Sequence, residues 1–326
     1  MSWLVTVFAI QVLPLVSHDA SAQDKYPSKP IRLVIPFAPA GSTDIVGRKL
    51  GEKMGSFLGT AFIIDNKAGA GGTIGAAEVA KARPDGYTLL FSASSTQVIA
   101  PLMMLPNPPY DGLKDFATIS LIGLQHMSVV AGPGMPAQNL RDMLALLRAN
   151  SGKYSYASAG IGSINHLTGE IFNRQANVKV THVPYKGTGP AMNDLMGGHI
   201  ALMMATTASV LDQVRTGKIR MLATFSDARL AATPDVPTAI EAGVPDMAVS
   251  TFSGLFAPSA ITRPLIAQIH QASARVLKDA EFQKNLESLG VEPVTDSTPE
   301  SATRFVSESF NRLAPVIKAL GIKLEQ

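Results

Sequence analysis

The feature that most constrains the fold is a unit that recurs along the chain: a short apolar run, a turn of small residues, and a helix. The first copy begins with residues 31–35, an apolar run rich in β-branched residues, which is typical of a buried strand. After the turn, Leu50, Met54 and Leu58 recur at helical spacing. Strands that alternate with helices in this way predict an α/β fold built on a parallel sheet.

The first turn, residues 36–44, has features that suit anion binding. Its prolines stiffen the backbone, and Gly41 allows a guest to approach closely. Ser42, Thr43 and Asp44 are good N-cap types, and the free amides of a helix N-terminus attract negative charge. The plainer alternative is a capped helix with no ligand.

Two further strand ends follow in the first third of the chain. The loop 69–75, which contains Gly72 and Thr73, has the spacing G-x-G-x-x-x-G and not the dinucleotide fingerprint G-x-G-x-x-G, so nucleotide binding is not expected. The strand 87–91 ends in a row of hydroxyl residues. This row contains Ser92, Ser94 and Thr96, which either line a cleft or cap the helix expected at 97–105.

A second α/β region repeats the pattern. A strand at 154–157 runs into the turn 158–163, and a helix follows that turn. Strands at 180–183 and 200–204 end in the segments 184–188 and 205–207. This region therefore offers its own set of strand ends.

The predicted domain organisation has two lobes joined by two crossings. Residues 23–125 and 246–326 form domain I, and residues 126–245 form domain II, since too few strands remain after residue 246 for a third sheet. The run 119–131 is predicted as two strands separated at Gln125 and His126, beside the first crossing. The second crossing is expected near 244–249.

Composition and the first residues bear on the compartment. The chain of 326 residues has 46% hydrophobic residues, no cysteine and a formal charge of +3 without a basic cluster, which does not favour nucleic-acid binding. Residues 1–22 are predicted to be a signal peptide cleaved near Ala22, because an apolar run precedes the Ala20-x-Ala22 pattern. Lys and Arg are missing before that run, which is atypical.

Candidate catalytic groups are sparse. Ser163 and His166 stand three residues apart, which leaves a periplasmic hydrolase as an alternative, although a helix cap with a nearby histidine is common. Histidines and carboxylates show no metal-ligand spacing, and no cofactor is expected. The surplus of neutral donors at strand ends favours recognition of a small anion over its conversion.

Six motifs lie along the chain after residue 22. They are Pro36-Phe37-x-x-x-Gly41-Ser42-Thr43-Asp44, Asp65-Asn66-Lys67-x-Gly69-Ala70-Gly71-Gly72, Pro84-Asp85-Gly86-Tyr87-Thr88-Leu89, Ala159-Gly160-x-Gly162-Ser163-x-x-His166-Leu167, Val183-Pro184-Tyr185-Lys186-Gly187 and Pro234-Asp235-Val236-Pro237-Thr238. Taken together, these motifs resemble those of the tripartite tricarboxylate transporter solute receptors, the Bug or TctC-type binding proteins. The resemblance covers nearly the whole chain after residue 22 and is specific in combination.

The resemblance implies a two-lobed periplasmic binding protein that closes on a small carboxylate and delivers it to integral-membrane permease subunits, without enzymatic activity and as a monomer. A ligand sensor for signalling is the other alternative. Ala40 replaces a usual glycine, which leaves the pocket size open. The expected ligand-binding residues are Phe37, Pro39, Ala40, Gly41, Ser42, Thr43, Asp44, Gly72, Thr73, Ser92, Ser94, Thr96, Ala159, Gly160, Gly162, Ser163, His166, Tyr185, Lys186 and Thr206.

Overall fold

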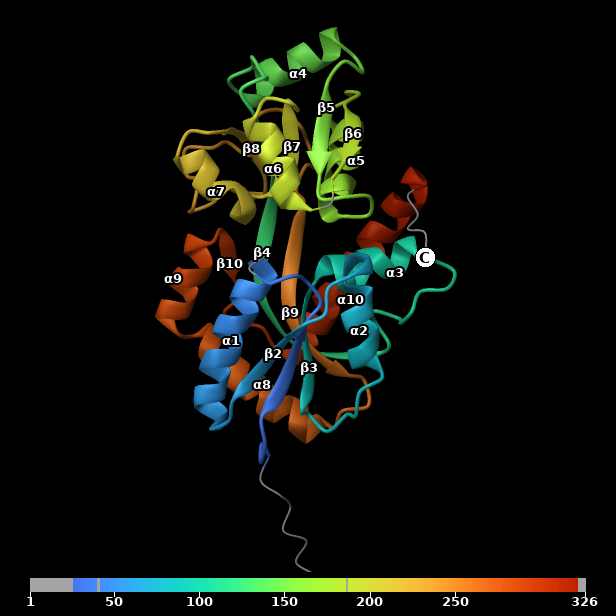
Figure 1. The fold of residues 1–326 in the computed structure, drawn as a ribbon, viewed down its shortest axis with the longest axis vertical. Coiled ribbons are helices and arrows are strands. Elements are labelled where there is room, and N and C mark those ends of the chain that lie inside the picture. Colours follow the sequence, from blue (N-terminus) through green and yellow to red (C-terminus); the bar gives the residue numbers. More distant parts are fainter. Residues whose placement is uncertain (1–25, 40–41, 186, 322–326) are drawn as a thin grey trace, which may run out of the picture.

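The computed structural model describes residues 26–39, 42–185 and 187–321, and the structural statements below concern these residues. They form two α/β lobes stacked along the long axis of the molecule (Figure 1). The predicted signal peptide, Ala40, Gly41 and Lys186 lie outside the described residues.

The first lobe contains the chain ends of the described part. Its elements are β1 (Ile31–Ile35), α1 (Ser42–Leu58), β2 (Phe62–Asn66), α2 (Thr73–Ala80), β3 (Thr88–Ala93), a π-helical turn (Ser95–Ile99), α3 (Ala100–Met103), β9 (Ser250–Pro258), α8 (Arg263–Leu277), α9 (Ala280–Ser288), β10 (Val291–Pro293) and α10 (Pro299–Leu320).

The second lobe is formed by the middle of the chain. Its elements are α4 (Leu140–Ala149), β5 (Ser155–Ser158), α5 (Ile164–Gln175), β6 (Thr181–Pro184), α6 (Thr188–Met196), β7 (Leu202–Thr206), α7 (Thr207–Arg215) and β8 (Arg220–Phe225). The strand order across both lobes is β2-β1-β3-β9-β4-β7-β5-β6, and β8 and β10 also pair with β4.

Strand β4 (Phe116–Ala131) is shared by the two lobes, and the predicted break at Gln125 and His126 is wrong. His126 pairs with Ser250 of β9, and the next residue, Met127, pairs with β7 and β8. The strand therefore changes partners without interruption, because a backbone ladder is available on either side of this point. The polar pair marks where the strand leaves one lobe and enters the other.

The second connection between the lobes lies beside the first. The Met127 amide donates to the carbonyl of Val249 at 2.9 Å, and the Val249 amide donates to the carbonyl of Phe225 at 2.9 Å. Residues 244–249, called the crossing segment below, are thus hydrogen-bonded to β4 and β8 through Val249. The exact domain boundaries at 125/126 and 245/246 stay predictions.

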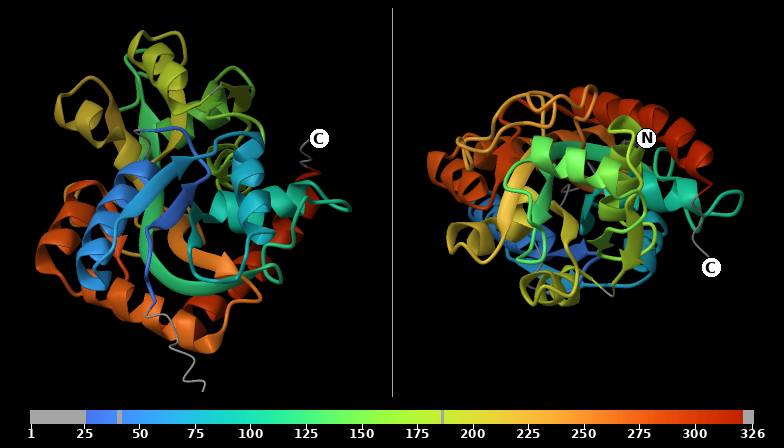
Figure 2. Two further views of the ribbon diagram at one scale, coloured as in Figure 1. Left: turned by 60° about the horizontal axis from the view of Figure 1, so that its bottom comes forward. Right: turned by 90° about the horizontal axis from the view of Figure 1, so that it is seen from above.

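Strand β1, inside the sheet of the first lobe, is buried on both faces, as expected of an inner parallel strand. Ile31 and Leu33 of β1 pack with α1, α8 and α9, whereas Val34 faces the core shared with α2 and α10. Figure 2 shows these helices on either side of the strands. Helices on both faces therefore hold the strands in place, and this positions the loops at the carboxyl ends of the strands.

The helix expected at 97–105 is shorter and begins differently. A π-helical turn, Ser95–Ile99, leads directly into α3. Single π-turns occur mostly inside helices and often near functional sites. Here the turn contains Thr96, the last residue of the hydroxyl row that begins in β3.

Candidate functional site

The strand directions bring the loops of the two lobes towards one another. In the first lobe β1, β2 and β3 are parallel, β3 is antiparallel to β9, and β9 is antiparallel to β4. In the second lobe β7 is antiparallel to β4, and β5 and β6 run parallel to β7. The carboxyl ends of β1–β3 therefore point along β4 towards the second lobe, and those of β5–β7 point back.

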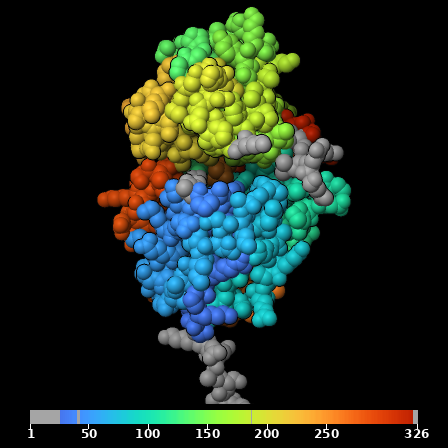
Figure 3. Space-filling view, viewed as in Figure 1, coloured from blue at the N-terminus to red at the C-terminus, as the bar shows by residue number. Residues whose placement is uncertain are grey.

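The register along β4 sets the separation of these ends. Ala93 at the end of β3 pairs with Ser253, which pairs with Gly123 of β4. Thr206 at the end of β7 pairs with Met127. The two levels differ by four residues (127 − 123), about 13 Å at a rise of about 3.3 Å per residue. Figure 3 shows a crevice between the lobes on this face.

Several helix N-termini share the space between the lobes. Helices α1, α2, α5, α6 and α7 each follow a parallel strand, so each begins at the carboxyl edge of its sheet. Free N–H groups and the positive end of the helix dipole concentrate there. This arrangement attracts an anion without needing a charged side chain.

The turn after β1 is anchored from below by Asp44. This side chain is 2% exposed and accepts hydrogen bonds from Arg48 Nε at 2.9 Å and from Asn66 Nδ2 at 2.8 Å. Asn66 Nδ2 also donates to the carbonyl of Phe37 at 3.0 Å. Asp44 therefore holds the loop. Asn66, the last residue of β2, belongs to one of the family motifs but was not among the expected site residues, because local sequence does not show that its amide reaches the loop after β1.

The other predicted residues of the first turn are described only in part. Phe37 is half-buried, Pro39 is exposed and Thr43 is buried. The side chain of Ser42, together with Ala40 and Gly41, lies outside the described part, so the effect of Ala40 on pocket size stays a prediction.

The glycine loop after β2 packs closely on the loop after β1 and on the hydroxyl row. A Cβ on Gly72, whose φ is +92°, would lie 2.4 Å from Thr96 Oγ1 and 3.3 Å from Pro36. Thr73 Oγ1 donates to the carbonyl of Ala70 at 2.9 Å. Gly72 is therefore required for close packing of loops.

The hydroxyl row at the end of β3 is turned inward. Ser94 Oγ lies 2.6 Å from Thr251 Oγ1 on β9, and Thr96 Oγ1 donates to the carbonyl of Gly71 at 3.2 Å. Ser92, Ser94 and Thr96 are all buried. These side chains hold the wall of the crevice together, and Thr251 joins them through a strand pairing that local sequence cannot reveal.

The turn after β5 forms the facing wall. Gly160 and Gly162 have φ values of +127° and +80°, in the region that favours glycine. Ser163 caps α5, because its Oγ accepts from the His166 amide at 3.2 Å, and the same Oγ donates to the carbonyl of Gly160 at 2.7 Å. The amide of Gly187 donates to the carbonyl of Ala159 at 3.2 Å, which fixes the rim of the turn.

The geometry at Ser163 does not form a nucleophile and base pair. Its Oγ bonds to backbone groups, and His166 Nδ1 accepts from the Gly162 amide at 3.3 Å. A hydrolase would need a hydrogen bond from the hydroxyl to a ring nitrogen. The structure gives Ser163 a capping role instead.

Two histidine rings stack beneath this turn. The rings of His166 and His182 have centroids 3.8 Å apart and an interplanar angle of 8°, and His182 also stacks on Tyr156 with centroids 5.1 Å apart. His182 Nε2 lies 2.6 Å from Ser158 Oγ. His182 was not among the expected site residues, because it comes from another strand and only the β5–β6 pairing places it beneath this turn.

The remaining predicted residues lie at the neighbouring strand ends. Tyr185 donates its OH to Asp194 Oδ2 of α6 at 2.7 Å, and burial together with that carboxylate raises the pKa of Tyr185 to about 12. Thr206 precedes α7 with no side-chain cap hydrogen bond. Asn165 Nδ2 donates to the carbonyl of Met204 at 2.7 Å, which ties α5 to β7.

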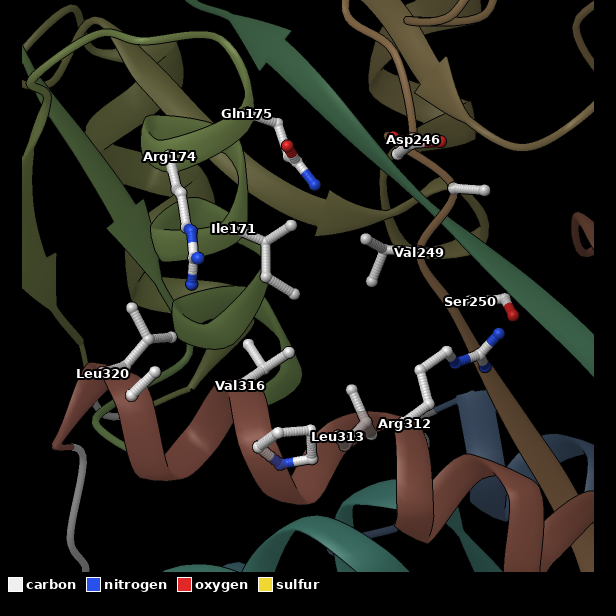
Figure 4. A pocket seen from close by; sticks show the side chains of 13 residues that line it. Ile171, Arg174, Gln175, Asp246, Val249, Ser250, Arg312, Leu313, Val316 and Leu320 are labelled. Atoms are coloured by element: carbon white, nitrogen blue, oxygen red, sulfur yellow. The ribbon is translucent and has the colours of Figure 1, made fainter.

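A separate groove of about 620 Å³ lies at the junction of the two lobes (Figure 4). Its walls are α5, α10 and the crossing segment, and it contains none of the predicted ligand-binding residues. Arg174 and Arg312 flank its apolar floor of Ile171, Val249 and Val316. Helix α10 therefore reaches the second lobe, although most of it packs on the first.

Two negative findings apply to the described ranges 26–39, 42–185 and 187–321. No cluster of three His, Asp or Glu side chains there could hold a metal ion. Among the helices of the same ranges, none combines the length and the apolar character that crossing a bilayer requires.

The comparisons with known proteins agree with this geometry. The profile of the tripartite tricarboxylate transporter family receptor, TctC, matches residues 46–322. The chain belongs to this receptor family. The predicted resemblance is thereby confirmed, and the family consists of solute-binding receptors.

Individual members of the TctC family are similar over their whole length. Protein BugT of Bordetella pertussis is 32% identical over 325 residues, which cover 100% of this chain and 99% of BugT. The structure of the periplasmic binding protein BugD is 34% identical with a TM-score of 0.82, covering 92% of this chain and 100% of BugD. MatC of Rhodopseudomonas palustris, solved with bound malate, is 31% identical with a TM-score of 0.80, and the match covers 90% of this chain and 100% of MatC. The two-lobed binding-protein fold is confirmed.

Proposed function

We propose that this TctC-family receptor captures a small carboxylate in the crevice between its lobes. The observation that carries the proposal is the convergence of the N-termini of α1, α5 and α7, which follow strand ends that point at one another. Uncharged N–H groups from both lobes would grip the anion, in agreement with malate bound to the related MatC.

The groups that line the crevice would have two roles, ligand contact and support of the wall. The backbone of residues 160–163 and the start of α1 would supply donors, with Ala40, Gly41, Ser42 and Lys186 as further candidates. The buried row after β3, with Gly72 and Thr73, would shape the wall. Gln97, in the π-helical turn after β3, and Thr207, at the start of α7, have buried polar atoms with no hydrogen-bond partner among the described residues. Both keep hydrogen-bonding capacity for a bridging water.

Domain movement would accompany capture. The lobes, with boundaries at 125/126 and 245/246, would close by rotation about β4 and the neighbouring crossing segment. The protein would act as a monomer after export and removal of residues 1–22. It would then deliver the carboxylate to the membrane permease subunits of a tripartite transporter, with no catalysis.

Calorimetry tests this function directly. Purified protein is titrated with mono-, di- and tricarboxylates that include malate, after mass spectrometry of any co-purified ligand released by mild denaturation. We expect one class to bind with a Kd in the micromolar range or below, and small-angle scattering to show a smaller radius in the complex. If no carboxylate binds to ligand-free protein, the proposal is rejected. Loss of uptake of the bound carboxylate in a deletion strain tests delivery.

A further inference from the structure

One backbone donor of the second-lobe turn is occupied in this structure. The Gly162 N–H donates to Nδ1 of His166 at 3.3 Å. Because an N–H group can only donate, Nδ1 must be the unprotonated nitrogen of the ring, and the neutral ring carries its proton on Nε2. His166 is therefore the resident acceptor for an amide that belongs to the proposed carboxylate site.

The ring of His166 is held in this position. It is 8% exposed and stacks on His182, whose Nε2 lies 2.6 Å from Ser158 Oγ in the same turn. Gly160 N–H donates to that Ser158 hydroxyl at 3.1 Å. Both histidines are thus connected to the turn, one through Gly162 and the other through Ser158.

Among the described residues, few charged or titratable groups lie near His166. Glu170, one turn further along α5, accepts from Tyr156 OH of β5 at 2.7 Å, and β6 contributes His182. Strand β7 (Leu202–Thr206) contributes no titratable side chain, and α10 brings Arg312 to the other end of α5 near Ile171. Burial lowers the pKa of His166 against a smaller opposing effect of Glu170, and burial with the neighbouring His166 lowers the pKa of His182 to about 4. Both shifts favour the neutral form of the rings in the absence of a ligand.

We propose that His166 is a proton-linked positioning residue for the carboxylate, an inference that rests on the proposed function. In the empty receptor its Nδ1 holds the Gly162 N–H. When a ligand carboxylate takes over that N–H, the hydrogen bond to Nδ1 breaks and an N–H to carboxylate bond forms. The freed Nδ1, now beside a negative charge, takes up one proton from the buffered solvent, whose buffer acid supplies it. No other bond changes.

This exchange makes binding depend on pH. A group that is protonated in the complex and neutral in the free protein tightens binding as pH falls, by at most tenfold per pH unit. Above pH 6 ligand carboxyl groups of ordinary pKa stay ionised, so their own titration does not interfere. We expect Kd to decrease at least about threefold from pH 8 to pH 6.

The experiment measures proton uptake and the His166 pKa separately. The tightest carboxylate of the panel is titrated calorimetrically at pH 6, 7 and 8 in buffers of different ionisation enthalpy, and NMR follows the His166 ring of the wild-type protein with and without it. We expect proton uptake on binding and a higher His166 pKa in the complex. The variant His166→Asn, which keeps an acceptor but does not titrate, is expected to bind without the pH dependence. His199→Gln, which removes an exposed histidine of the same lobe, is the matched control and keeps it.

The outcomes separate this inference from the function on which it rests. Binding with a flat pH profile, an unchanged or lower His166 pKa in the complex, or an equal pH dependence in His166→Asn would each overturn it. The NMR result on wild-type protein decides the matter even if the variant does not fold. If no carboxylate binds at all, the proposed function fails and the inference fails with it.

Discussion

Asn66 Nδ2 donates to Asp44 Oδ1 across 2.8 Å, which joins the end of β2 to the first turn of α1. The same amide reaches the carbonyl of Phe37 at 3.0 Å, so one side chain fixes both ends of the loop after β1. The Asp44 carboxylate already accepts hydrogen bonds from Asn66 and Arg48, and its negative charge would repel an anionic ligand. The loop is therefore built around Asp44, and backbone groups are its proposed ligand donors.

Removal of this anchor should lower stability more than it changes ligand preference. Asp44→Ala is expected to reduce the free energy of unfolding by about 2 kcal/mol, because buried hydrogen bonds to a charged group are lost. Arg48→Ala is the comparison variant: it removes the Arg48 donor and leaves the Asn66 donor to Asp44 in place, so it should destabilise the protein less than Asp44→Ala does. Urea denaturation measures both. A changed order of carboxylate affinities in Asp44→Ala with unchanged stability would contradict this role.

Ser163→Ala tests capping against catalysis. Loss of the cap of α5 should reduce the free energy of unfolding by about 1 kcal/mol. Ser288→Ala, at an exposed site that caps no N-terminus, should change it by less than about 0.5 kcal/mol. Thermal denaturation and an ester panel are measured on wild type and both variants, and no turnover is expected in any of them. Ester hydrolysis by wild type that disappears in Ser163→Ala at unchanged stability would favour the hydrolase.

Gly162→Val should damage binding specifically. A β-branched side chain at φ +80° costs about 1–3 kcal/mol of backbone strain, and it also displaces a donor from the proposed site. We expect Kd to rise about 10- to 100-fold, the loss expected for one hydrogen bond to a charged group.

A matched glycine separates strain from ligand contact. Gly198 has φ +75° and open space around it, so Gly198→Val should be similarly strained yet bind normally. Calorimetry of both variants checks this. Equal losses of affinity, or wild-type affinity in Gly162→Val, would remove residues 160–163 from the site.

The histidine stack should make the folded protein sensitive to acid. Because the pKa of His182 falls from 6.5 to about 4 on folding, the unfolded chain binds this proton more readily between those values. The contribution of neutral His182 to the free energy of unfolding is therefore complete above pH 6.5 and is lost as pH falls towards 4. After allowance for partial exposure of the ring, we expect a loss of about 1–2 kcal/mol.

The variant His182→Gln should have a flatter stability profile between pH 6.5 and pH 4, measured by urea denaturation at each pH. His199→Gln is the control and should follow wild type. A profile of His182→Gln identical to that of wild type would mean that His182 is protonated at the same pH in the folded and unfolded states.

Local sequence determined the units of this protein. An apolar run such as residues 31–35 is typical of a strand that is buried on both faces. When a glycine- or serine-containing turn and a segment of helical spacing follow such a run, the sequence predicts a strand, a turn and a helix. The motifs around Asp44, Ser163 and His166 also identified the family, because their order along the chain is specific even where each alone is weak.

Only the tertiary structure decided which groups meet. The sequence predicted a break at Gln125 and His126, but the ladder continues through them because partner strands from both lobes are present. His182 lies under the turn of His166, and Thr251 lies against Ser94, through pairings between segments 16 and 157 residues apart. Local propensity describes the backbone near each residue, whereas these contacts depend on strand order and register, which are set by the packing of the whole sheet.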